Sequence, residues 1–344
     1  MALLFGESFA HLATADLGKK WTGMPSQWAI QSADPRTPGG KYLQVASTTG
    51  AFARTIPASS TIIAGCGFWT TGGGPQDINI ISFQDAGGEQ ISLRLQAGTN
   101  RLFVSRNGTT LATSVGGLNA AQWYYIEFKA TIHNTAGAYA VRLNGAAVAG
   151  IPDATNVNTR GTGTNNSASQ VLFHDSRNHV SNTHRYADIY ILDGTGTVLN
   201  DFLGDVRYDV LYPNGAGAYT QWTPSAGANW ETVDEAQANT TDYVTSTVDN
   251  QIDSYAFGDL SGSPATVHAV IVNVFAQKTD AANKSIAIFC KASDGNESTG
   301  PDLALSTGWM VYQRVLPQEP ASGGDRAWTA ARVNGSEFGV KSRP

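Results

Sequence analysis

Residues 90–96 read QISLRLQ and residues 124–132 read YYIEFKATI. In both stretches apolar and polar side chains alternate, which is typical of half-buried β-strands, because successive side chains point to opposite faces. The pattern predicts that Glu127 and Lys129 face water. The positions predicted to face a core are Ile91, Leu93, Leu95, Tyr124, Ile126, Phe128 and Ile132.

Further short stretches of strand-forming residues are separated by turn signals such as Asn107-Gly108 and Asn144-Gly145. We expect strands in residues 61–71, 78–84, 101–105, 139–143, 171–174 and 186–192. Strands this closely spaced, with little helical periodicity between them, predict an all-β chain that begins with an antiparallel β-sandwich.

The composition along the chain predicts two domains. Residues 1–211 form the first sandwich, and residues 212–242, rich in Trp, Gly and Pro, form a connector. Residues 243–344 form a smaller second β-rich sandwich domain. Within it, residues 328–338 fit either a short helix or an irregular strand, and the sequence does not decide between them.

The run 267–276 (VHAVIVNVFA) is apolar on both faces. A strand covered on both faces is central in a sandwich or lies under another subunit. We interpret the run as a central strand. Separately, because exposed sheet edges need cover and a net charge of −6 gives little repulsion, we expect the protein to form an oligomer.

Charge and hydrophobicity exclude several classes of function. The net charge is −6 over 344 residues, so the chain has no basic field for nucleic acid. No apolar stretch approaches the ~18 residues needed to span a bilayer, so we expect no membrane insertion. Residues 1–21 do not resemble a secretory signal, which predicts synthesis and retention in a cytoplasm. We interpret Cys66 and Cys290, each within an apolar run, as buried structural thiols.

Motifs that would identify an enzyme are not found. The chain has no GxSxG, HExxH or Walker motif in the required context, and its acidic residues are scattered rather than paired. We therefore expect no catalytic residues, no cofactor and no enzymatic activity.

The candidate metal ligands are His174, Asp175, His179 and His184, within the stretch HDSRNHVSNTH. The spacing of five residues between the histidines matches neither one face of a strand nor a helical turn. We interpret them as polar loop histidines, with a metal site as the alternative.

Carbohydrate recognition needs an aromatic ring that stacks on the C–H face of a sugar, together with polar groups for its hydroxyls. Most aromatic side chains, including Trp69 and Trp123, lie in strand patterns that predict burial in a core. Tyr125 alternates with core positions and is the candidate glycan-binding residue. A subunit contact is the alternative for this side chain.

Two groups of residues resemble known families. Residues 117–129 (GLNAAQWYYIEFK) and 139–145 (YAVRLNG) resemble the concanavalin A-like, or laminin-G-like, jelly-roll domains, in which a Trp opens one long strand and an Asn-Gly turn ends the next. Residues 186–227, which begin YADIYILDG, and the ending 328–340 are similar to segments of virion proteins of tailed bacteriophages.

This resemblance implies a bacteriophage virion structural protein without enzymatic activity, as a tail-associated, fibre or decoration subunit. Its location would be the virion, after synthesis in the host cytoplasm. Its partners would be other virion proteins, copies of itself and host cell-surface polysaccharide. Two alternatives remain: a carbohydrate-active enzyme, either a glycosidase or a lyase, that acts on host polysaccharide, and a stand-alone glycan-binding module.

Overall fold

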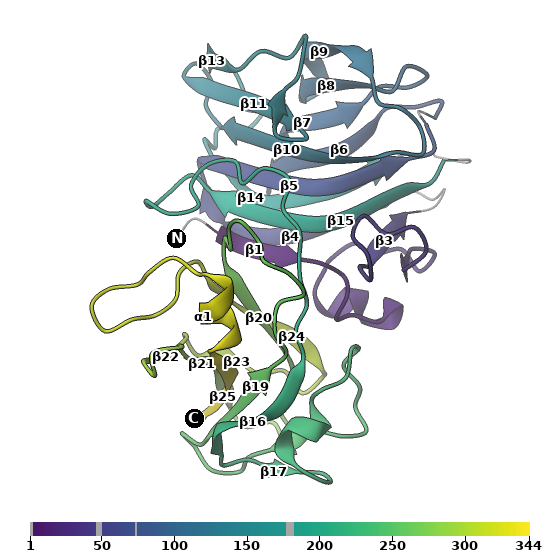
Figure 1. The fold of residues 1–344 in the computed structure, drawn as a ribbon. Helices are drawn as coiled ribbons and strands as arrows, with labels where there is room; N and C mark the ends of the chain where they lie inside the picture. Colours follow the sequence, from purple (N-terminus) through teal and green to yellow (C-terminus); the bar gives the residue numbers. More distant parts are fainter. Residues whose placement is uncertain (1–2, 46–49, 73, 177–181) are drawn as a thin grey trace. The chain divides into compact units, whose positions relative to one another are not determined.

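A computed structural model describes residues 3–45, 50–72, 74–176 and 182–344, and nearly all of its regular structure is antiparallel β (Figure 1). The predicted all-β fold class is confirmed. The chain divides into two compact units: unit 1 comprises Met1–Phe9 and Thr14–Tyr208, and unit 2 comprises Ala10–Ala13 and Asp209–Pro344.

Unit 1 is a sandwich of two sheets, sheet A and sheet B (Figure 1). Sheet A consists of β1 (Leu3–Glu7), β2 (Ala29–Gln31), β3 (Tyr42–Val45), β5 (Thr61–Thr70), β10 (Trp123–Thr131), β11 (Gly137–Leu143), β12 (Ala146–Ala147), β13 (Ala154–Val157) and β15 (His184–Asp193). Its central order is β11-β10-β5-β15-β3. Sheet B has the order β4-β14-β6-β7-β8-β9. Its strands are β4 (Gly50–Ser59), β14 (Ala168–Ser176), β6 (Ile78–Asp85), β7 (Gly88–Leu95), β8 (Arg101–Arg106) and β9 (Thr109–Gly117). A 3-10 helix, η1 (Thr14–Lys19), precedes β2.

The core of unit 1 lies between the two sheets. Phe83 of β6 stacks on Phe128 of β10 with ring centroids 5.0 Å apart, and Phe52 of β4 meets Tyr186 of β15 edge to face. The inward positions predicted in β7 and β10 are all buried. Each large apolar side chain buried in this way contributes roughly 1.5–3 kcal/mol, so the alternating pattern accounts for the sandwich.

Both cysteines are buried free thiols, as predicted. Burial raises the pKa of Cys66, and it raises the pKa of Cys290 to about 12. Neither thiol is therefore a reactive thiolate near neutral pH.

Unit 2 is the smaller β-rich sandwich. Sheet C consists of β16 (Pro213–Thr220), β19 (Ile252–Phe257), β25 (Glu337–Arg343), β21 (Ser285–Lys291), β22 (Glu297–Thr299) and β23 (Leu303–Ala304). Two strand pairs accompany it: β20 (Val270–Ala276) with β24 (Met310–Leu316), and β17 (Thr223–Pro224) with β18 (Val244–Thr245). The helices are η2 (Asn229–Thr232) and α1 (Ala330–Asn334). The core packs Cys290 and Phe338 of sheet C against Leu316 of β24 and Trp328.

Several segments of unit 2 differ from the sequence patterns. Residues 212–242, expected as a connector, contain β16, β17 and η2. Residues 328–338, left undecided, form α1 and the first residues of β25. The expected central strand in residues 267–276 is wrong: β20 pairs with β24 alone, in a two-stranded sheet. Within the described ranges, no helix is both long and apolar enough to cross a bilayer.

Candidate functional site

The two described histidines of the predicted metal cluster lie in strands, not in a loop. His174 belongs to β14 and His184 to β15, both are 1% exposed, and their ring centroids are 5.3 Å apart. His174 also meets the ring of Trp28 edge to face at 5.4 Å. The loop interpretation is therefore wrong for these two residues, because the alternation of β14 and β15 turns them into the sandwich.

The structure does not test the other two candidates, so their part in a metal site stays a prediction. Asp175 follows His174 in β14, and His179 lies outside the described residues. Among the residues that the structure describes, no group of three or more His, Cys, Asp or Glu side chains is placed to hold a metal ion.

Tyr125 lies on the outer face of sheet A but is only 1% exposed. The guanidinium carbon of Arg36 lies 4.5 Å from the centroid of its ring, and its hydroxyl donates to the carbonyl of Asp188 at 3.0 Å. Burial raises the pKa of Tyr125 well above its usual value. The predicted glycan-binding ring is thus covered by the chain itself.

Arg36 belongs to a roof that covers the middle of sheet A, which we define as residues 34–37 and 201–208. Its guanidinium pairs with Asp188 and Asp205 and donates to the carbonyl of Val206 at 2.8 Å. The guanidinium fits because β5 has Gly67 below it: a Cβ there would lie 2.6 Å from Cδ of Arg36. A glycine inside an apolar strand marks such a close approach.

A second contact holds the roof over Glu127, which is fully buried rather than facing water as the alternation predicted. Its carboxylate accepts hydrogen bonds from the hydroxyl of Tyr190 at 2.5 Å and from the backbone N–H of Gly204 at 2.8 Å. A Cβ on Gly65 would lie 2.3 Å from the ring of Tyr190. Sequence reasoning missed the roof, although Gly65-Cys66-Gly67 was a visible signal for it.

One end of sheet A is less covered, and aromatic side chains gather there. Trp123 pairs with Trp69 across the strands, and Trp69 pairs with Arg185. All three are half-buried. Tyr42 of β3 completes this group as a buried ring, 1% exposed, with its centroid 5.7 Å from that of Trp123. We call Tyr42, Trp69, Trp123 and Arg185 the aromatic row.

Arg185 is held by rings rather than by anions. Its guanidinium carbon lies 4.0 Å from the ring centroid of Trp69 and 4.8 Å from that of Tyr42. Its Nε is buried without a hydrogen-bond partner, and within the described part of the chain no acceptor contacts its Nη groups. The aromatic row therefore combines flat apolar surface with a cation whose hydrogen-bonding capacity is unused.

The outer face of sheet B is polar, and its side chains bond to one another. Arg94 donates from Nη2 to both carboxylate oxygens of Glu89, at 2.9 and 2.8 Å, and from Nε to the hydroxyl of Ser92 at 2.9 Å. Asn79 donates to the same carboxylate at 3.2 Å. We call these four residues the Arg94 network.

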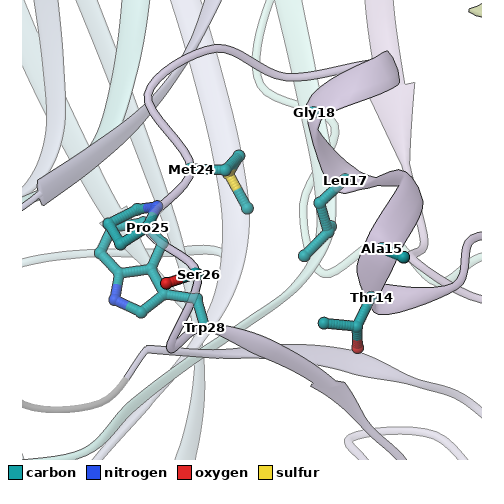
Figure 2. A pocket seen from close by; sticks show the side chains of 8 residues that line it. All are labelled: Thr14, Ala15, Leu17, Gly18, Met24, Pro25, Ser26 and Trp28. Atoms are coloured by element: carbon teal, nitrogen blue, oxygen red, sulfur yellow. The ribbon is translucent and has the colours of Figure 1, made fainter.

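Unit 1 also contains a cavity of about 290 Å³ beside η1, shown in Figure 2. It is lined by Thr14, Ala15, Leu17, Gly18, Met24, Pro25, Ser26 and Trp28. These residues carry no charge, so the cavity supplies no acid, base or ion-pairing group.

These features define unit 1 as a jelly-roll sandwich with an aromatic row at one end of its larger sheet. No family model matches the chain, and no curated protein matches it. Among solved structures, the chain is similar to a cellulose-induced protein at 14% identity and a TM-score of 0.40, covering 54% of this chain and 96% of that one.

Two further structures show a similar likeness. A carbohydrate esterase from the Shiga toxin-encoding bacteriophage phi24B is 12% identical with a TM-score of 0.41, over 56% of this chain and 99% of that one. An alginate lyase is 10% identical with a TM-score of 0.35, over 56% and 95%. At such identity and TM-score the likeness concerns the fold alone.

One expectation has to be corrected. From the sequence we expected a protein without enzymatic activity, and the comparisons contradict this expectation: the similar structures include two alginate lyases, the phage carbohydrate esterase and sialidases. The expectation is withdrawn.

Proposed function

We propose that the protein is a carbohydrate-active enzyme and that unit 1 binds its polysaccharide across the aromatic row. The observation that carries the proposal is the half-buried cross-strand pair Trp123 and Trp69. Aromatic rings offer large flat surfaces for the C–H faces of a sugar, and a few placed polar groups then fix its orientation. Arg185 and Gln44, paired on neighbouring strands, supply such groups beside the rings.

Two carboxylates that pair with Arg36 of the roof are our candidates for the chemistry. Asp188 lies on β15, the same strand as Arg185. The carboxylates of Asp188 and Asp205 both pair with the guanidinium of Arg36. Burial raises the pKa of Asp188, against the opposing effect of Arg36, whereas the Asp205 side chain is 40% exposed. Two carboxyl groups in such different environments are suited to separate acid and base roles in glycosidic bond cleavage.

The test is a panel of neutral and acidic polysaccharides, with binding measured by calorimetry and cleavage by new reducing ends and by the absorbance of unsaturated sugars. We expect Trp69→Ala and Trp123→Ala to weaken binding. Tyr243→Ala, which removes an exposed aromatic ring of unit 2, is the matched control. Asp205→Asn should abolish cleavage and leave binding intact. No binding to any polysaccharide, or binding that survives both tryptophan substitutions, would contradict the proposal.

We also propose that the protein is carried on the particle of a tailed bacteriophage, after synthesis in the host cytoplasm. Support comes from the resemblance of residues 186–227 and 328–340 to virion proteins. Its partners would then be other virion proteins and copies of itself, with host-surface polysaccharide as the ligand. Mass spectrometry of gradient-purified particles tests this proposal, and absence of the chain from them would refute it.

A further inference from the structure

We propose that the polysaccharide bound at the aromatic row is acidic and that Arg185 binds its carboxylate group. This inference rests on the proposed function and names the chemical class of the ligand. The favoured ligand is a polymer of uronic acids, in which a carboxylate is attached directly to the sugar ring.

The position of Arg185 supports this assignment. Trp69 and Tyr42 both lie within 5 Å of its guanidinium carbon, at 4.0 and 4.8 Å from their ring centroids. Aromatic contacts of this kind restrict where the planar group lies, and its N–H groups point outward in its own plane. A carboxylate that approaches in this plane accepts two parallel hydrogen bonds.

The electrostatic surroundings of Arg185 also favour an anionic ligand. Two other arginines on the outer faces of unit 1 have carboxylate partners within the chain: Arg94 pairs with Glu89, and Arg142 makes two hydrogen bonds of 2.7 Å to Asp153. Arg185 has no such partner among the described residues, and its Nε is buried without an acceptor. A ligand carboxylate would supply the missing counter-charge for this half-buried cation.

The rings beside Arg185 favour a sugar acid over a simple anion as the ligand. Trp69 is in register with both Trp123 and Arg185, so one flat surface adjoins the cation across neighbouring strands. A free phosphate or sulfate ion has no apolar face for such a surface. A uronic acid has both a C–H face and a carboxylate, and thus uses both parts of the row.

The experiment uses the full chain and matched polymers. Polygalacturonate and its fully methyl-esterified form share a backbone and differ in charge, while dextran sulfate and dextran test a sulfated ligand in the same way. Affinity is measured by calorimetry at two salt concentrations. We expect binding to polygalacturonate that weakens with salt, and binding to its ester that is at least roughly tenfold weaker, as for loss of one charge-assisted pair.

Substitutions of Arg185 test whether this side chain is responsible for the affinity for polygalacturonate. Arg185→Met keeps a long side chain between the rings but removes the charge, and we expect roughly tenfold weaker binding to polygalacturonate. Arg185→Lys keeps the charge and loses the planar fork, so an intermediate affinity is expected. Arg106→Met, on β8 of sheet B, is the matched control and should bind as the wild type does. Thermal unfolding of each variant verifies that it is folded.

The outcomes separate this inference from the proposed function. Equal affinity for polygalacturonate and its ester, or wild-type affinity in folded Arg185→Met, would overturn the inference and leave polysaccharide binding standing. Arg185-dependent binding to dextran sulfate but not to polygalacturonate would also overturn the carboxylate assignment. Failure to bind all four polymers would contradict the proposed function and the inference together.

Discussion

Arg94 on the outer face of sheet B and Arg185 on the outer face of sheet A are in opposite situations. On sheet B, Arg94 is neutralised by Glu89 and bonded to Ser92, so its charge is used within the chain. On sheet A, Arg185 contacts rings and lacks an anion among the described residues. An arginine on a sheet face therefore indicates a ligand only when the chain itself leaves its hydrogen-bonding groups unused.

The same comparison applies within sheet A. Arg36 and Arg185 both lie against aromatic rings, but Arg36 also pairs with Asp188 and Asp205 and is only 3% exposed in its side chain. We therefore assign Arg36 to holding the roof and Arg185 to ligand binding.

The largest expected effect is that of Gly65→Val in β5. The added Cβ would lie 2.3 Å from Cε1 of Tyr190, whose ring is 1% exposed and has no room to move away. We expect a loss of about 3 kcal/mol of unfolding free energy, measured by urea denaturation. Gly116→Val is the control, because Gly116 is also a strand residue and its Cβ would meet nothing within 4 Å. Equal stability of the two variants would show that the ring of Tyr190 is not closely packed on β5.

Glu127→Ala is expected to have the next largest effect. It leaves the buried hydroxyl of Tyr190 and the N–H of Gly204 without their acceptor, which costs about 2–3 kcal/mol. The control Lys129→Ala, on the same strand, removes an ion pair with Asp201, which is 66% exposed, and should cost less than about 1 kcal/mol. A double-mutant cycle with Tyr190→Phe should show coupling, and additive losses would refute the contact.

Part of this account was accessible from the sequence. Period-two alternation predicted β7 and β10, and it also turns Arg185 outward between His184 and Tyr186. It failed for Glu127, because alternation assigns a face and does not reveal that a distant segment covers that face. Arg36 and Asp188 are 152 residues apart, so no local pattern encodes their pairing. The partners of β20 were missed for the same reason.

Replacing Arg94 by Met should lower stability by about 1 kcal/mol, because Glu89 loses a cation that donates to both of its oxygens. The side chain of Arg94 is 23% exposed, so water compensates in part. Urea denaturation of Arg94→Met and Arg185→Met measures the difference. A greater loss of stability in Arg185→Met would mean that Arg185 serves mainly in packing.

The smallest expected effect is the pH dependence contributed by Asp188. Burial raises its folded-state pKa above the usual value of 3.8, against the opposing effect of Arg36, so the folded protein binds a proton more readily than the unfolded chain. This contribution to stability is fully present below the unfolded pKa and is lost as pH rises through the folded pKa. Compared with Asp188→Asn, the wild type should therefore gain stability as the pH falls from 7 toward 3.8. A stability difference that does not change with pH would contradict the raised pKa.

We infer that Arg185, and not Arg94, binds an acidic sugar. The most direct test is the affinity of folded Arg94→Met and Arg185→Met for polygalacturonate, measured by calorimetry beside the wild type. We expect wild-type affinity for Arg94→Met and roughly tenfold weaker binding for Arg185→Met. The reverse pattern, with binding lost in Arg94→Met and kept in Arg185→Met, would contradict this inference and move the ligand to sheet B.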